Sequence, residues 1–160
     1  MKSALLVIDM QKKFYFGRTK DLMDSASFVI NSMIDKFRNK NYPIIWIQHE
    51  SRVLGLIKNT ESFGIIENLK PKAEDERIVK TKMNSYIKTG LKDMLDKNGI
   101  SNIVVCGYAA EFCVINTYKG SLKLNYQVTS LKDGIASGSK SAIKKVEKRT
   151  NAKSIDEIVL

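Results

Sequence analysis

The stretch NIVVCGYAAEFCVINT, residues 102–117, decides the fold. Its apolar run at 103–106 is typical of a buried strand, which Gly107 ends. From Glu111 onward, apolar residues recur at the spacing of a helix that packs back on that strand. Cys113 is therefore expected near the first turn of a helix, just beyond the carboxyl end of a strand.

This position gives Cys113 two interpretations. A lone cysteine is often a small buried hydrophobic residue. The carboxyl ends of strands in open α/β sheets are, however, where ligands bind, and a helix N-terminus lowers the pKa of a thiol. The position thus favours a reactive cysteine.

The rest of the chain alternates between strand and helix patterns. We expect strands at 4–8, 43–48, 77–80, 103–106 and 127–130, and helices at 20–39, 89–98, from 111 and at 139–148. This alternation predicts a single α/β domain over residues 1–160, a Rossmann-like three-layer α/β/α sandwich with a mostly parallel sheet of five to six strands.

Three segments have weaker patterns. Residues 51–75 are expected to form loops with one short helix at most, and such a segment can fold over a site. Asp133-Gly134 predicts a turn that ends the fifth strand. Residues 155–160 are either a final strand or a short docking helix.

Composition narrows the function classes. The net charge is +10, but the 27 Lys and Arg are spread along the chain, which favours a lysine-rich surface over nucleic-acid binding. No apolar run reaches membrane-spanning length, so we expect no membrane partner. Two cysteines make no disulfide framework, and we expect both to be reduced. The first residues lead directly into a strand, so we expect no signal peptide and a cytoplasmic location.

Polar side chains follow several of the predicted strands. Asp9, Lys80 and Cys113 lie at or just past three carboxyl ends, which share one edge of a parallel sheet. A carboxylate, an ammonium and a thiol brought together would be a nucleophile with its activating groups, although Asp9 could equally be a turn or cap residue. His49, the single histidine, is a strand-end residue or a pocket wall, and alone it cannot form a multi-histidine metal site.

Five segments carry a resemblance to a known family. They are LLVIDMQKKF at 5–14, PIIWIQH at 43–49, IVKTKMNSYIKTGL at 78–91, GISNIVVCGYAAEFCVINT at 99–117 and NYQVTSLKDGIAS at 125–137. With these segments the chain resembles the isochorismatase-like cysteine hydrolases, a superfamily that includes nicotinamidases and N-carbamoylsarcosine amidohydrolases. The resemblance covers nearly the whole chain.

The resemblance implies a catalytic triad of Asp9, Lys80 and Cys113. Lys80 is preferred to Lys82 because the family's lysine stands nine residues before a Thr and eleven before a Leu, as Lys80 does here. In the implied mechanism, Asp9 takes the proton of Cys113 and the thiolate forms a thioester with the substrate. The family also carries a cis peptide bond, which would lie here between Tyr108 and Ala109.

Further site residues follow from the same resemblance. The backbone N–H groups of Ala109 and Cys113 would form an oxyanion hole. Phe14, His49 and Phe112 are candidates for the substrate pocket, together with parts of the segment 51–75. The chain departs from the family at position 110, which is Ala where Thr is frequent.

The implied activity is metal-independent hydrolysis of a C–N bond in a small amide, carbamoyl or ureide substrate, with no cofactor. The metal-binding Asp/His cluster of the nicotinamidases is missing, and isochorismatase itself lacks the cysteine that stands here at position 113. We expect a homo-oligomer, a dimer or a tetramer, as the family often forms. The alternative is a catalytically idle family member that serves as a small-molecule-binding or oligomeric scaffold.

Overall fold

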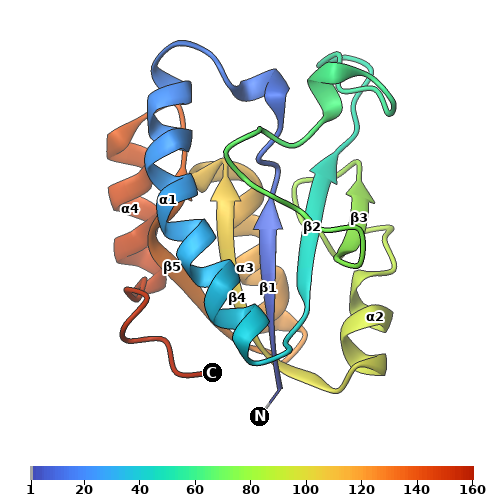
Figure 1. Ribbon diagram of the computed structural model, residues 1–160, viewed down its shortest axis with the longest axis vertical. Helices are drawn as coiled ribbons and strands as arrows, with labels where there is room; N and C mark the ends of the chain where they lie inside the picture. Colours follow the sequence, from blue (N-terminus) through green and yellow to red (C-terminus); the bar gives the residue numbers. More distant parts are fainter. Residues whose placement is uncertain (1) are drawn as a thin grey trace.

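A computed structural model describes residues 2–160, which form a five-stranded sheet between two layers of helices (Figure 1). The strands are β1 (Lys2–Ile8), β2 (Ile44–His49), β3 (Glu76–Lys80), β4 (Ile100–Tyr108) and β5 (Gln127–Ala136). They lie in the order β3-β2-β1-β4-β5, and every neighbouring pair is parallel. The predicted α/β class is confirmed, with five strands.

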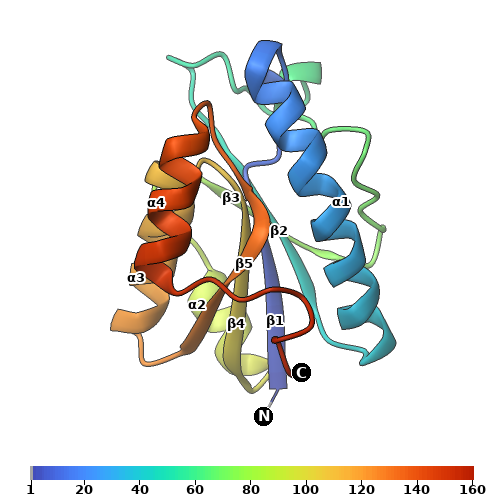
Figure 2. The ribbon, with the colours of Figure 1, turned by 90° about the vertical axis from the view of Figure 1, so that its left-hand side faces the viewer.

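Helices cover both faces of this sheet. They are α1 (Gly17–Asn39), α2 (Leu91–Lys97), α3 (Ile115–Lys123) and α4 (Lys140–Thr150). Figure 2 shows α1 on one face, with α2, α3 and α4 on the other. Short helical turns stand at Lys12–Phe14, Glu61–Phe63 and Ala110–Val114, and the last of these is a π-helical turn that leads into α3.

The central strand β1 shows why the sheet needs two helical layers. Leu5 and Val7 pack into the core beneath α1, whereas Leu6 and Ile8 pack into the core on the other face. All four side chains are at most 1% exposed. An uninterrupted apolar run is the pattern of a parallel strand that is covered on both sides.

The predicted end of the fifth strand is wrong. β5 continues through Asp133 to Ala136, and its pairing with β4 jumps from Ser130 opposite Val105 to Ile135 opposite Gly107. Asp133 adopts a φ of 60° inside this irregularity. The turn-favouring residues therefore form a bulge within the strand, which bends it without ending it.

The last residues are neither the strand nor the helix that the sequence predicts. Ile158 is 4% exposed and packs into the α1 core, and Lys36 Nζ donates to the carbonyl oxygens of Ile155 and Ile158 at 2.8 and 2.6 Å. This segment is held by apolar contacts of Ile155, Ile158 and Leu160 and by one lysine, without regular backbone pairing.

Across residues 2–160, each helix is too short or too polar to cross a lipid bilayer. The carboxyl ends of the parallel strands all lie at the upper edge of the sheet in Figure 1, where the loops after β1, β2 and β3 gather.

Candidate active site

The site is built on a buried ion pair. Asp9 follows the last residue of β1, and Lys80 is the last residue of β3. Lys80 Nζ lies 2.7 Å from Asp9 Oδ2, and the two side chains are 0% and 2% exposed. Lys82 is exposed, so the lysine that reaches the carboxylate is Lys80. A charged pair this deeply buried loses its hydration, and such pairs are found mainly where the charges have a role.

The ammonium of Lys80 has three partners. Besides Asp9, Nζ lies 3.1 Å from Nδ1 of His49 and 3.2 Å from Sγ of Cys113. An ammonium carries three N–H bonds, and each of these is directed to one partner. The structure thus brings Asp9, Lys80 and Cys113 together at one point, with His49 beside them.

A tight corner after β4 places Cys113 at this point. Gly107 has a φ of +109°, and a Cβ added there would lie 2.1 Å from the carbonyl oxygen of Ile8. Only glycine lets the end of β4 pass so close to the end of β1. The Tyr108–Ala109 peptide bond is cis, as the resemblance implies. The π-helical turn that follows carries Cys113.

Burial governs the proton affinities in the site. Burial raises the pKa of Asp9 above the ordinary value, and the charge of Lys80 opposes this effect. Burial, reinforced by the charge of Asp9, raises the pKa of the Cys113 thiol to about 12, while Lys80 again opposes it. The expected lowering of this pKa is therefore not found, because burial and the charge of Asp9 together outweigh the opposing charge of Lys80.

The resting state therefore holds Cys113 as a thiol beside a potential base. Oδ1 of Asp9 is buried and has no hydrogen-bond partner within residues 2–160. Sγ of Cys113 lies within 4.8 Å of an Asp9 carboxylate oxygen. This arrangement can move a proton from sulfur to carboxylate as the sulfur attacks a substrate.

A cavity of about 300 Å³ opens onto the sulfur. Its wall is mostly apolar, and the rings of Phe14 and Tyr108 stack there with centroids 4.6 Å apart. The lining residues are Asp9, Phe14, His49, Leu54, Met83, Tyr108, Ala109, Phe112 and Cys113. All three pocket candidates from the sequence lie in this wall.

Two further lining residues are Leu54, which lies in the segment 51–75 that was expected to contribute to the pocket, and Met83, which sequence reasoning missed. Leu54 comes from the unpatterned segment after β2, and Met83 lies in the connection that follows β3. Both side chains are about half exposed, at 47% and 51%. The sequence signal for both was a large apolar side chain in a loop. Exposed apolar side chains that gather at one place often mark a binding site.

Gln11 is a second residue that sequence reasoning missed. Its side chain is fully buried, and it clamps the backbone of His49: Nε2 donates to the His49 carbonyl at 3.1 Å, and Oε1 accepts from the His49 N–H at 2.8 Å. Nε2 also donates to the carbonyl of Phe63 at 3.0 Å. Gln11 thereby fixes the end of β2 and the loop that follows it. The available signal was the position of this amide residue, two residues beyond Asp9 at the same strand end.

Asp9, His49 and Cys113 together resemble a set of metal ligands, because one ligand atom from each lies within 4.8 Å of the others. Sequence reasoning considered multi-histidine sites and the Asp/His cluster of the nicotinamidases, and it missed this trio. Lys80 Nζ, however, contacts an atom of all three residues. A divalent ion at their centre would have to displace the ammonium, so the trio fits the cation that the chain itself supplies.

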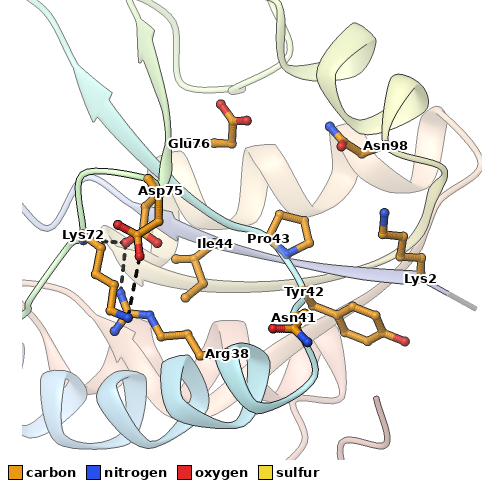
Figure 3. Close-up of a pocket in the computed structure, with 11 residues that line it drawn as sticks. Lys2, Arg38, Asn41, Tyr42, Pro43, Ile44, Lys72, Asp75, Glu76 and Asn98 are labelled. Atoms are coloured by element: carbon orange, nitrogen blue, oxygen red, sulfur yellow. Dashed lines mark hydrogen bonds and ion pairs between the residues drawn. The ribbon is translucent and has the colours of Figure 1, made fainter.

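A second cavity, of about 370 Å³, lies at the opposite edge of the sheet (Figure 3). Asp75 dominates it: Oδ2 accepts from Arg38 at 3.0 Å, from the Trp46 indole at 2.8 Å and from the Lys72 N–H at 2.7 Å. The residues that line this cavity include no cysteine, serine or histidine. These contacts tie α1 to the loop before β3, and they occupy the Asp75 carboxylate with structural hydrogen bonds.

Comparison with known proteins agrees with this geometry. The family model of the isochorismatase domain matches residues 3–156. The chain belongs to the isochorismatase family. A Bacillus subtilis relative, the uncharacterized isochorismatase family protein YrdC, is 33% identical over 141 residues, which cover 84% of this chain and 74% of that protein.

Solved structures of the isochorismatase family show the same fold. N-carbamoylsarcosine amidase from Thermoplasma acidophilum is 27% identical, with a TM-score of 0.84 and coverage of 99% of both chains. An isochorismatase-like hydrolase from Alkaliphilus metalliredigens is 24% identical, with a TM-score of 0.87 and coverage of 97% of this chain and 94% of that chain. This chain therefore has an isochorismatase-family hydrolase fold that is related to amidases.

Proposed function

We propose that this protein is a metal-independent cysteine hydrolase that cleaves a C–N bond of a small amide, carbamoyl or ureide compound through a thioester. One observation carries the proposal: a single buried ammonium, that of Lys80, contacts both Asp9 and Cys113, and the sulfur faces a cavity. The triad is Asp9, Lys80 and Cys113.

The first half of the reaction forms the thioester. Asp9 takes the thiol proton while Sγ of Cys113 bonds to the carbonyl carbon, and the C=O electron pair moves to oxygen. As the tetrahedral intermediate collapses, the C–N bond breaks and Asp9 returns the proton to the leaving nitrogen. Lys80 stabilises the negative charge as it passes from carboxylate to sulfur.

The second half consumes water. Asp9 accepts a proton from a water molecule, whose oxygen bonds to the thioester carbon. Collapse of this intermediate breaks the C–S bond, and the proton on Asp9 returns to the sulfur. The products are a carboxylic or carbamic acid and ammonia or an amine, and the triad regains its resting state.

The oxyanion of both intermediates needs donors. We assign this role to the backbone N–H groups of Ala109 and Cys113, since both residues line the cavity beside the sulfur. Hydrogen-bond donors that are already in place stabilise the oxyanion as it forms. They lower the activation barrier because they need not reorient during the reaction.

The relationship to N-carbamoylsarcosine amidase, at 27% identity over nearly all of both chains, supports the choice of a C–N bond. The alternative within the family is a catalytically idle scaffold that binds small molecules without turnover. An ammonia-release screen over small amides and ureides decides between them, run on the wild type and on Cys113→Ala. Release that depends on Cys113 supports the proposal, whereas wild-type protein that releases no more than Cys113→Ala supports the scaffold.

We also propose that the protein is located in the cytoplasm and that it forms a homo-oligomer. Sedimentation velocity on the purified chain tests the second.

A further inference from the structure

His49 contacts the triad through Lys80 but has no role in the proposed reaction, and its hydrogen bond to Lys80 fixes which ring nitrogen carries the proton. Lys80 can only donate, so the 3.1 Å contact between Lys80 Nζ and His49 Nδ1 requires Nδ1 to accept. An imidazole whose Nδ1 accepts carries its proton on Nε2. The ammonium thereby selects one tautomer and leaves Nε2–H as a donor.

The position of this ring is also fixed. Gln11 holds the N–H and the carbonyl of His49 with two hydrogen bonds, at 2.8 and 3.1 Å. Burial lowers the pKa of His49, and the charge of Lys80 lowers it further, so the neutral ring prevails at neutral pH. His49 lines the cavity, and Nε2 is the ring nitrogen that is not occupied by Lys80.

The remainder of the cavity wall is poor in charge. Six of its side chains carry apolar surface, namely Phe14, Leu54, Met83, Tyr108, Ala109 and Phe112. The lining residues include no Lys or Arg. The nearest cation, Lys80, directs its three N–H bonds to Asp9, His49 and Cys113. A substrate carboxylate in this cavity would lose its hydration without gaining a cationic partner.

We propose that the substrate is an uncharged compound with an apolar body, and that an acceptor atom on this body receives a hydrogen bond from His49 Nε2–H. The inference rests on the proposed function, since it names the substrate class of the same site. His49 is then a specificity-determining residue. The apolar wall favours substrates with an apolar body, and the fixed Nε2–H donor favours those whose acceptor atom lies at the matching distance from the scissile carbonyl.

The overall charge of +10 argues in the other direction, because it attracts anions. This attraction is screened over about 8 Å at physiological ionic strength. It can bring an anion to the surface, but it supplies no partner inside an apolar cavity. The cost of burying the anion therefore decides the preference.

Binding tests this inference without turnover. The Cys113→Ala protein is titrated, with NMR detection, with benzamide, the three pyridine carboxamides and 3-carbamoylbenzoate. We expect at least one pyridine carboxamide to bind roughly three- to tenfold more tightly than benzamide, the range that one net hydrogen bond gives. The pyridine ring is less apolar than benzene, so a gain in affinity points to the ring nitrogen. The anionic probe should bind most weakly.

Two further variants locate the donor. Asparagine at position 49 places an oxygen near Nδ1 and can accept from Lys80, but it does not reach the Nε2 position. Glutamine places an NH₂ group near Nε2. In the Cys113→Ala background, His49→Asn should reduce the ratio of pyridine carboxamide to benzamide affinity to about one, whereas His49→Gln should keep part of it. Using a ratio removes any general loss of binding.

The outcomes separate this inference from the proposed function. Tightest binding of 3-carbamoylbenzoate, or equal affinities for benzamide and all three pyridine carboxamides, would overturn the inference even if amides are hydrolysed. A preference that survives His49→Asn would overturn the assignment to His49. If the binding pattern appears but the wild type releases no ammonia from any amide, the inference about the ligand holds and the hydrolase proposal fails.

Discussion

Lys80 Nζ lies 2.7 Å from Asp9 Oδ2, and the two side chains are 0% and 2% exposed. This pair predicts how substitutions behave. Asp9→Asn, Lys80→Ala and Cys113→Ala should each lower kcat/KM of amide hydrolysis by about 10³-fold or more, and a double variant should be little worse than a single one, because the groups act as a unit. Steady-state kinetics on folded variants checks this.

Lys82→Ala is the matched control, because Lys82 is exposed and lies two residues from Lys80. It should keep most of the activity. Loss at Lys82 combined with retention at Lys80 would mean that the wrong lysine has been assigned to the triad.

The two cysteines should differ in how they react with a small alkylating reagent. Burial raises the pKa of Cys113 to about 12, so only a small fraction is thiolate at pH 7, and that fraction grows tenfold per pH unit below the pKa. Alkylation of Cys113 in the free protein should accelerate steadily from pH 7 to pH 10. Peptide mass mapping against time measures it.

Cys106 serves as the internal reference. It is fully buried on β4, burial also raises its pKa, and it should be labelled more slowly than Cys113 at every pH. A rate at Cys113 that is already maximal at pH 6–7 would show a stable thiolate and contradict the raised pKa.

Hydrolysis should survive exhaustive chelation. The three potential metal ligands Asp9, His49 and Cys113 already surround the ammonium of Lys80, which holds the central place. Activity is measured after treatment with a chelator and dialysis, with metal content determined in parallel. Activity that disappears and then returns with a divalent ion would refute metal independence.

Gly107→Ala should destabilise the fold by about 3 kcal/mol or more, because the new Cβ would lie 2.1 Å from the Ile8 carbonyl at a φ of +109°. Gly90→Ala is the matched control, since nothing lies within 4 Å of a Cβ there. Urea unfolding of both variants gives the comparison. Equal stabilities would show that the corner between β4 and Cys113 tolerates a side chain.

The fold was predictable because its evidence lies in local patterns. The apolar runs that become β1 and β4 and the helical spacing of α1 are read directly from neighbouring residues. Asp133-Gly134 misled because turn chemistry also suits a bulge, and only the partner strand determines which of the two forms.

The site was predictable in part for a similar reason. Strand ends share an edge, so Asp9, Lys80 and Cys113 could be placed at that edge, and the family resemblance then implied that they form one triad. The pKa of Cys113 could not be foreseen, because it depends on how deeply the sulfur is buried beside Asp9. Met83 and Gln11 were missed, and Leu54 was expected only as part of the segment 51–75, because their contacts join segments that are far apart in the chain.

Covalent attachment of the substrate to Cys113 tests the central claim most directly. The enzyme is mixed with the most active amide from the ammonia-release screen and quenched in acid during turnover, and its peptides are mapped by mass spectrometry. A parallel reaction contains hydroxylamine, which intercepts a thioester. The proposed mechanism predicts an acyl group on Cys113 and formation of the hydroxamate. Ammonia release with an acyl group on another residue, or with neither an adduct nor a hydroxamate, would contradict it.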